Sequence, residues 1–289
     1  MNELFAQLLA KGPVVTDGAW GTQMQARGLN IGEAPDLWNL SHPDKVEEVA
    51  RAYVEAGSNI ILTNTFGASR VRLSDHELAD KAIDINREGA AISKRAAQDK
   101  AKVFASIGPS GKLLMMGQTS EEELLASFEE QANALAAGGA DAIVIETMSD
   151  PNEARIAVAA AKQTGLPVVA CMVFDTGKNK DRTMMGTTPE EAAELMCKSG
   201  ADAIGSNCGQ GIEGFIDICR RMKSACDKPI WIKANAGLPK LVNGEAVYTT
   251  TPQEFAQRIG ALVEVGASFI GGCCGTTPEF IRAVCDTLE

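Results

Sequence analysis

The chain has 289 residues, of which 45% are hydrophobic and 5% aromatic, and its formal net charge is -11 at pH 7. This length suits one large α/β barrel or two small domains. The acidic balance argues against a nucleic-acid or anionic-membrane partner, because either requires a basic face.

No targeting or membrane-spanning segment is expected from the sequence. The N-terminal MNELFAQLLAKG carries an acidic residue early, and its apolar run is too short for a signal peptide. No stretch approaches the roughly 18 apolar residues that cross a bilayer. A cytoplasmic location is therefore expected, and the 8 cysteines are expected to be free thiols or metal ligands rather than disulfides.

Apolar, β-branched segments alternate with amphipathic segments from one end of the chain to the other. The expected strands are Pro13–Thr16, Asn59–Asn64, Lys102–Ile107, Asp141–Glu146, Pro167–Phe174, Asp202–Asn207, Pro229–Ala234 and Ser268–Gly272. The expected helices between them include Asp44–Ala56, Glu121–Ala137, Pro189–Lys198 and Pro252–Val265. The last two begin with TPEE and TPQE, which predict a capping box with Pro at the first helical position. This alternation predicts one (β/α)8 barrel domain over residues 1–289, with its active site at the C-terminal ends of the strands.

A partial internal repeat places four glycines just before alternate strands. Gly57, Gly139, Gly200 and Gly266 are each interpreted as a glycine that ends a helix and leads into strand 2, 4, 6 or 8. Alternate barrel strands contribute side chains to the same interior layer. Seven residues after each glycine come Asn64, Glu146, Asn207 and Cys273, and the next positions are Thr65, Thr147, Cys208 and Cys274. Polar and thiol groups are thus expected to gather at the barrel mouth.

Three of these cysteines form a candidate metal site. Cys208 follows strand 6 in GSNCGQG, and Cys273 and Cys274 follow strand 8 in GGCCGTT. Three thiolate ligands suit a catalytic zinc ion, because the fourth tetrahedral position stays open for substrate. His42 and His76 do not lie in comparable places. The remaining thiols are interpreted as small apolar core residues, and they are Cys171, Cys197, Cys219, Cys226 and Cys285.

The residues alone leave other functions open. The glycine-rich turn and Thr276-Thr277-Pro278 resemble a phosphate cradle, although cysteines supply no useful donors to an anion. Cys273 and Cys274 are alternatively a redox dithiol, although adjacent cysteines form only a strained disulfide. A non-catalytic zinc module is expected to have four protein ligands.

A series of motifs favours one of these functions. DGAWGT (17–22), TNTFG (63–67), SIGPSG (106–111), IET (145–147) with Asp150, NC (207–208), NAGLP (235–239) and GGCCGT (271–276) occur in order. This series resembles that of the homocysteine S-methyltransferase family, above all its cobalamin-dependent branch. The resemblance implies one Zn2+ per chain bound by Cys208, Cys273 and Cys274, which activates homocysteine or a similar thiol for methylation to methionine.

The resemblance also indicates which residues surround the amino-acid part of the thiol substrate. It points to Asp17, Glu146 and Asn235. Glu146 can accept hydrogen bonds from an ammonium group, and the turn at Gly18 and Ala19 can offer backbone N–H groups to a carboxylate. For Asp17 and Asn235, the alternative is a role in capping loops.

The resemblance to the cobalamin-dependent branch implies a methyl-corrinoid as the methyl donor. This donor is expected on a separate protein, because the chain has no domain of its own to hold it. Trp20 can cover the bound thiol or contact a corrinoid, or it only plugs the mouth. The alternative donors are S-methylmethionine, S-adenosylmethionine and betaine, although the few aromatics give little material for a cage around a quaternary ammonium group.

Overall fold

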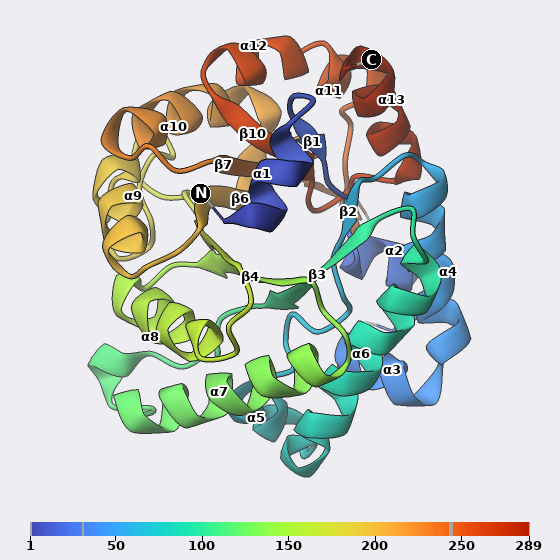
Figure 1. Ribbon diagram of the computed structural model, residues 1–289, viewed down its shortest axis with the longest axis vertical. Coiled ribbons are helices and arrows are strands. Elements are labelled where there is room, and N and C mark those ends of the chain that lie inside the picture. Colours follow the sequence, from blue (N-terminus) through green and yellow to red (C-terminus); the bar gives the residue numbers. More distant parts are fainter. Residues whose placement is uncertain (1, 31, 243–244, 289) are drawn as a thin grey trace.

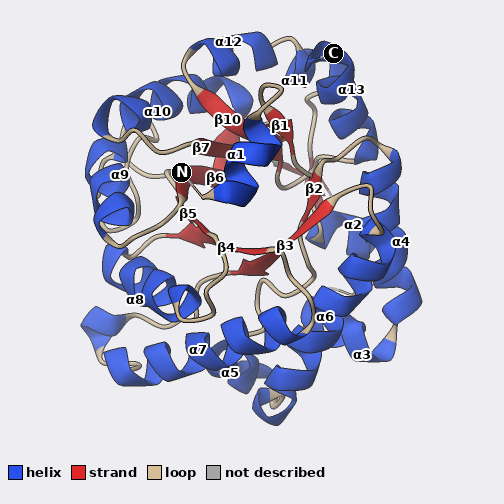
Figure 2. Ribbon diagram, in the orientation of Figure 1, coloured by secondary structure: helices blue, strands red, loops and turns tan. Residues whose placement is uncertain are grey.

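Eight parallel strands form a barrel in the centre of the molecule (Figure 2), in the order β1-β10-β7-β6-β5-β4-β3-β2. The structure is a computed structural model, in which residues 2–30, 32–242 and 245–288 are described. A bridge between Thr16 and Ile60 brings the two outer strands of this order together. The strands are β1 (Val14–Val15), β2 (Ile60–Ile61), β3 (Lys102–Ile107), β4 (Ala142–Met148), β5 (Val168–Met172), β6 (Ala203–Gly211), β7 (Ile230–Asn235) and β10 (Ala267–Gly272). The prediction of a (β/α)8 barrel is confirmed.

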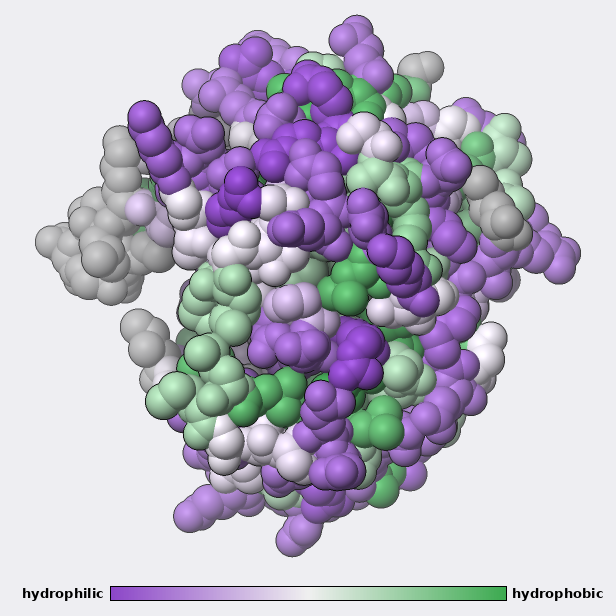
Figure 3. Space-filling model, turned by 90° about the vertical axis from the view of Figure 1, so that its left-hand side faces the viewer, coloured by the Kyte–Doolittle hydropathy of each residue, from purple (hydrophilic) through white to green (hydrophobic). Residues whose placement is uncertain are grey.

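Helices surround the barrel and cover its outer face (Figure 1). They are α2 (Gly21–Ala26), α3 (Trp38–Ser41), α4 (Pro43–Glu55), α5 (Arg70–Leu73), α6 (Ala82–Ala97), α7 (Glu121–Ala137), α8 (Pro151–Lys162), α9 (Pro189–Lys198), α10 (Ile212–Ala225), α11 (Pro252–Ala256), α12 (Ile259–Glu264) and α13 (Pro278–Leu288). A further helix, α1 (Glu3–Leu9), lies inside this ring, at one end of the barrel (Figure 1). Figure 3 shows that hydrophilic residues cover much of one flank of this helical ring. Within the described ranges, no helix has both the length and the apolar composition needed to cross a bilayer.

The barrel interior is a packed hydrophobic core of its own. Inward-facing residues of the strands form one buried cluster together with Phe5 of α1. The Phe5 ring lies 5.7 Å from that of Phe104 and 5.4 Å from that of Phe269, measured between centroids. Helix α1 therefore closes the N-terminal end of the barrel (Figure 1), and the opposite end remains for a site.

The four glycines of the internal repeat have the conformation that their position requires. Gly57, Gly139, Gly200 and Gly266 have φ values of 104°, 94°, 89° and 105°. These left-handed values favour glycine over any residue with a Cβ atom, so each glycine ends a helix as predicted. The two predicted capping boxes are also present at Thr188 and Thr251.

Two elements differ from the predictions. The helix expected over Pro252–Val265 is divided into α11 and α12 around Gln257 and Arg258. Apolar residues on both sides of this break are buried, so the hydrophobic periodicity continues through it and does not reveal it. The loop after β7 also contains an antiparallel pair, β8 (Lys240–Val242) and β9 (Glu245–Val247), which was not predicted.

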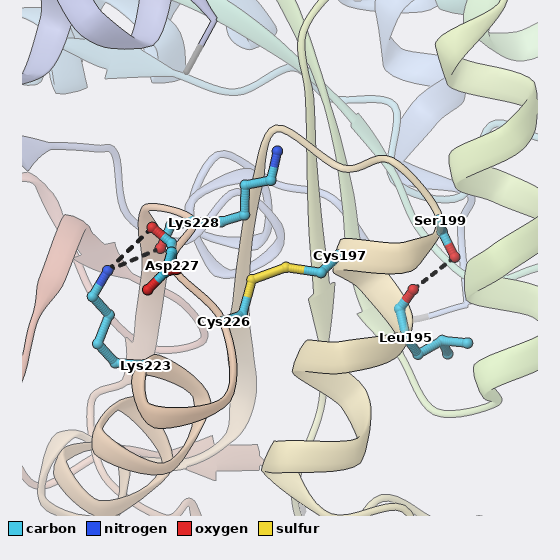
Figure 4. The surroundings of a disulfide bond; sticks show 7 residues. All are labelled: Leu195, Cys197, Ser199, Lys223, Cys226, Asp227 and Lys228. Atoms are coloured by element: carbon cyan, nitrogen blue, oxygen red, sulfur yellow. Dashed lines mark hydrogen bonds between the residues drawn. A yellow bond between two sulfur atoms is a disulfide. The ribbon is translucent and has the colours of Figure 1, made fainter.

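The cysteines also differ in part from the predictions. Cys171 and Cys219 are buried as expected, but Cys197 and Cys226 form a disulfide (Figure 4). Cys197 lies in the last turn of α9, and Cys226 follows the C-terminus of α10. The ends of these two neighbouring helices bring the sulfur atoms together across 29 residues of sequence. The expectation that all the cysteines are free thiols or metal ligands is therefore wrong for this pair.

Candidate metal and substrate site

Three cysteine side chains meet at the C-terminal mouth of the barrel. Cys208 lies within β6, and Cys273 and Cys274 directly follow β10. Their Sγ atoms all lie within 4.8 Å of one another, and those of Cys208 and Cys274 are 3.8 Å apart although 66 residues separate them in sequence. Strands β6 and β10 flank β7 in the barrel, which explains how the three thiols come together.

The backbone at Cys208 is held in an uncommon conformation. Cys208 has a φ of 63°, and Thr147 has a φ of 61°. The two residues are equivalent, because each comes eight positions after a glycine of the internal repeat. The pairing of β6 with β7 also shifts register between Asn207 and Gly211. Left-handed conformations of residues other than glycine cost about 1 kcal/mol or more and concentrate at functional sites. Here the conformation turns the Cys208 side chain toward the other two thiols.

The thiol cluster has the composition and spacing of a zinc site. A tetrahedral zinc ion with Zn–S distances of about 2.3 Å requires Sγ atoms about 3.8 Å apart, which is the separation of Cys208 and Cys274. Hydrogen bonds from Cys273 and Cys274 lower the pKa of Cys208 to about 3. The same contact with Cys208 raises the pKa of Cys274 to about 12 and that of Cys273 well above its usual value. Ionisation of Cys208 thus disfavours ionisation of its two neighbours, and a bound cation would favour the thiolate form of all three.

The turn after β10 is packed closely and is not an open phosphate cradle. The Thr276 hydroxyl donates to the carbonyl of Cys273 and accepts from Ala19 N–H at 3.1 Å. The Tyr248 ring lies so close to Gly275 that no Cβ atom fits there. Among the described residues, the group of side chains that could hold a metal ion contains three cysteines, whereas a structural zinc module has four protein ligands.

Glu146 and Asn207 form a hydrogen-bonded pair just inside the thiols. Asn207 Nδ2 lies 3.2 Å from Glu146 Oε2, 2.7 Å from Thr147 Oγ1 and 3.9 Å from Cys273 Sγ. The other oxygen of Glu146 accepts from the Ser106 hydroxyl. Burial raises the pKa of Glu146, although Lys233 and Ser106 act in the opposite direction. Glu146 is thus a buried carboxylate fixed at the mouth.

Asp17 occupies the neighbouring position and is fully enclosed. Its Oδ2 atom accepts from Trp20 Nε1 and from the Leu62 backbone N–H, both at 2.7 Å, and its Oδ1 atom forms an ion pair with Lys233. Lys233 was not among the residues predicted for the site. A lysine within the apolar segment IWIKAN is the signal that identifies it, because a charge in a buried strand needs a partner.

The turn after Asp17 is held by contacts from three directions. Gly18 lies so close to the Tyr53 hydroxyl that a Cβ atom would be only 2.7 Å from it. Tyr53 also donates to the Ala19 carbonyl at 2.7 Å, while Ala19 N–H donates to Thr276. Trp20 packs against the core clusters and its indole N–H is held by Asp17.

Asn235 ends β7 beside the thiol cluster. It is buried, it contributes a hydrogen bond that lowers the pKa of Cys208, and its Oδ1 atom has no hydrogen-bond partner among the described residues. A buried acceptor without a partner costs about 1–3 kcal/mol, so such an atom commonly meets a ligand or an ordered water.

Other polar positions of the sequence lie outside this cluster. Asn64 binds Asn39 and the carbonyl of Pro35 instead of joining Glu146 and Asn207. His42 and His76 line a separate cavity of about 430 Å³ next to Trp38. Equivalent positions after the repeat glycines therefore meet at the ends of β4, β6 and β10, as expected, but the end of β2 does not join them.

These features define a (β/α)8 barrel with three convergent thiols and buried carboxylates at its mouth. The model of the homocysteine S-methyltransferase family matches residues 14–288. The chain belongs to this family, as its motifs indicate.

Individual relatives agree with this assignment. The chain is 33% identical over 296 residues to a methionine synthase from Mycobacterium tuberculosis, and 32% identical over 294 residues to one from Mycobacterium leprae. Both matches include 96% of this chain but only 25% and 24% of those proteins, so the chain spans about a quarter of their length. The homocysteine methyltransferase MmuM from Escherichia coli, in its metallated form, has the same fold, with a TM-score of 0.81, 22% identity and coverage of 98% of this chain and 99% of that one.

Proposed function

We propose that the chain is a zinc-dependent S-methyltransferase that methylates homocysteine, or a closely similar thiol, to methionine. The observation that carries this proposal is the convergence of Cys208, Cys273 and Cys274 within 4.8 Å at the mouth of the barrel. The family and the names of its relatives support homocysteine as the acceptor.

Zinc bound by the three cysteine thiolates would offer an open fourth position and favour the deprotonated form of the incoming thiol, at a centre whose formal charge of -1 keeps the sulfur electron-rich. The protein supplies the ligands and their arrangement. Asn207, adjacent to Cys208, reaches Cys273 and Glu146, so one amide side chain links the thiol cluster to the amino-acid end of the site.

The amino-acid end is built by Glu146, Asn235 and the turn at residues 17–19. A substrate ammonium group would donate to Glu146 and to the Oδ1 atom of Asn235, which has no hydrogen-bond partner in the described part of the chain. The substrate carboxylate would lie against the backbone of Gly18 and Ala19, where Thr276 now accepts from Ala19. We assign to Asp17 the role of fixing this turn, because both of its oxygens already accept hydrogen bonds from the protein.

For the methyl donor, we propose a methyl-corrinoid carried by a separate protein. Large hydrophobic side chains are exposed on four different loops that follow β2, β3, β5 and β7, and these loops all lie at the mouth. They are Phe66, Met115, Met116, Met184, Met185, Leu238 and Val247, and we refer to them as the apolar rim. Exposed apolar residues gathered around a site are typical of a surface that another protein covers.

A small-molecule donor is the second candidate, and one cavity favours it. A space of about 630 Å³ is lined by Gln210 to Gly214, which follow Cys208 in the chain, by Gly237 and Leu238, and by Thr249 and Thr250. This volume falls in the range of ordinary small-ligand sites, about 300–1,000 Å³. S-methylmethionine, S-adenosylmethionine and betaine are the molecules to test there.

An assay with a panel of donors tests the proposed function. Zinc-loaded protein is mixed with homocysteine and with methylcobalamin, methylated corrinoid protein, S-methylmethionine, S-adenosylmethionine or betaine, and methionine is measured. Turnover with a corrinoid supports the full proposal. Turnover with only a small molecule replaces the donor but leaves the thiol chemistry intact. If no donor converts homocysteine while the protein holds stoichiometric zinc, homocysteine is not the acceptor.

A further inference from the structure

A buried lysine lies beneath the proposed substrate site, and the proposed function gives it no role. Lys233 is on β7, in register with Asn207 of β6 and Gly271 of β10, and its side chain is 2% exposed. Removing an ammonium group from water costs several kcal/mol, so a buried lysine needs a compensating charge. Asp17 provides that charge through a direct ion pair, and the Asp17 side chain is itself fully buried.

Three charged groups thus share the interior just below the thiols: Asp17, Glu146 and Lys233. Asp17 accepts from Lys233, whereas Glu146 accepts from the neutral side chains of Ser106 and Asn207. Among the described residues, no salt bridge reaches Glu146. Lys233 still interacts favourably with both carboxylates, although burial opposes its charge, and the net effect raises the pKa of Lys233. With both carboxyl groups ionised and Lys233 protonated, the group holds one more negative charge than positive, and the surplus lies on Glu146, which has no ion-pair partner among the described residues.

We propose that Lys233 is a positioning residue that neutralises Asp17, so that Glu146 alone receives the cationic group of the substrate. This inference rests on the proposed function, because it assumes an amino-acid thiol as the ligand. The Lys233–Asp17 pair would also contribute to specificity for thiols that carry one ammonium group. The pair sets the charge of the pocket to the value that one ammonium group cancels.

The proposal requires both members of the pair. Without Asp17, the Lys233 ammonium has Glu146 as its remaining partner and competes with the substrate for it. Without Lys233, two uncompensated carboxylates share a buried space and one of them takes up a proton, which weakens the negative charge that faces the substrate. Removing both charges leaves Glu146 ionised and unpaired, as in the original protein.

A double-mutant cycle on zinc-loaded protein tests this prediction. Asp17→Asn, Lys233→Met and the double variant are compared by calorimetric titration with homocysteine and with 4-mercaptobutanoate, which lacks the amino group. Each single variant is expected to weaken homocysteine binding about tenfold or more, the scale of one charge-assisted hydrogen bond. Asp17→Asn retains one oxygen that can accept from Trp20 and Leu62, so the turn should stay in place. Binding of 4-mercaptobutanoate should therefore change less than about threefold, and the double variant should restore homocysteine affinity.

Two further variants provide controls. Lys233→Met combined with Glu146→Gln has the same net charge as the restored double variant but no carboxylate at the ammonium position, so it should not regain affinity. Lys102→Met removes an exposed lysine at the opposite end of a barrel strand and should leave both affinities unchanged. If Lys233→Met does not fold, Asp17→Asn and its combination with Lys233→Met still test the proposal.

Several results would overturn the inference. Equal losses with both thiols in the single variants would show that Lys233 only supports the fold. A double variant as weak as Asp17→Asn would show that Asp17 itself binds the ammonium group. If the unmodified protein binds 4-mercaptobutanoate as tightly as homocysteine, Glu146 receives no ammonium group and the inference fails, while the zinc–thiol chemistry stands. If the unmodified protein binds neither thiol, the proposed function itself is wrong.

Discussion

Glu146→Gln changes the charge of the site with little change to its shape. Glu146 accepts from Asn207 at 3.2 Å through one oxygen and from the Ser106 hydroxyl through the other. The Gln carbonyl can keep the bond to Asn207, and its amide can donate to Ser106, because a hydroxyl turns to accept as readily as to donate. The variant should therefore fold normally and hold the same amount of zinc.

The expected loss is that of one hydrogen bond to a charged group, about 1.5–3 kcal/mol, or roughly 10- to 150-fold in the Kd for homocysteine. The assay measures binding of homocysteine and 4-mercaptobutanoate near pH 8. Burial raises the pKa of Glu146, so the measurement is made above neutral pH, which favours the ionised form of the unmodified carboxyl group. A comparable loss with 4-mercaptobutanoate would refute the assignment of Glu146 as the ammonium partner, because that thiol has no ammonium group to lose.

Three other predictions concern the metal, the donor and the stability. Cys273→Ala with Cys274→Ala should remove zinc and activity but shift the Tm by only a few degrees, because the barrel core forms without the metal; stoichiometric zinc in that variant would disprove the ligand set. Met115→Glu with Met116→Glu should slow methyl transfer from a corrinoid protein but not from free methylcobalamin, whereas Ile83→Glu, an exposed apolar residue on α6, should affect neither. Arg221→Met should cost about 1 kcal/mol of unfolding free energy at pH 7, because Arg221 lowers the pKa of Glu190 to about 2. A carboxyl group with a lowered pKa stabilises the fold at pH values above its pKa in the unfolded chain, and this stabilisation is lost as the pH falls toward 2. Urea unfolding at pH 3 should therefore show a smaller loss of unfolding free energy in the Arg221→Met variant than at pH 7. Arg220→Met is the matched surface control.

Much of the barrel follows from local sequence signals. The helix-ending glycines, such as Gly57 and Gly266, occupy the left-handed conformation that their spacing implied. The thiols of Cys208 and Cys274 meet because equal distances from these glycines correspond to equal heights in the barrel. Backbone conformations of this kind depend on only a few neighbouring residues, so they can be predicted from a single sequence.

Features that depend on packing between distant segments were not readable. The Lys233–Asp17 pair joins β7 to the turn after β1, and the two residues are 216 positions apart. The Cys197–Cys226 disulfide joins the ends of two helices, and neither cysteine differs locally from an ordinary core thiol. Asn64 has the same spacing from its glycine as Glu146, but the nearby α3 provides Asn39 as a competing partner. In each case the role of the residue depends on a partner that is distant in sequence, and the local sequence pattern does not indicate which residue that partner is.

X-ray absorption at the zinc edge, with and without homocysteine, tests the central claim most directly. The account predicts that purified protein binds one zinc ion with three sulfur ligands and one lighter ligand, and that homocysteine replaces the lighter ligand to give four sulfurs. The same spectrum should remain unchanged when methionine is added instead. Zinc that keeps three sulfur ligands in saturating homocysteine would contradict the claim that this metal centre binds the substrate thiol.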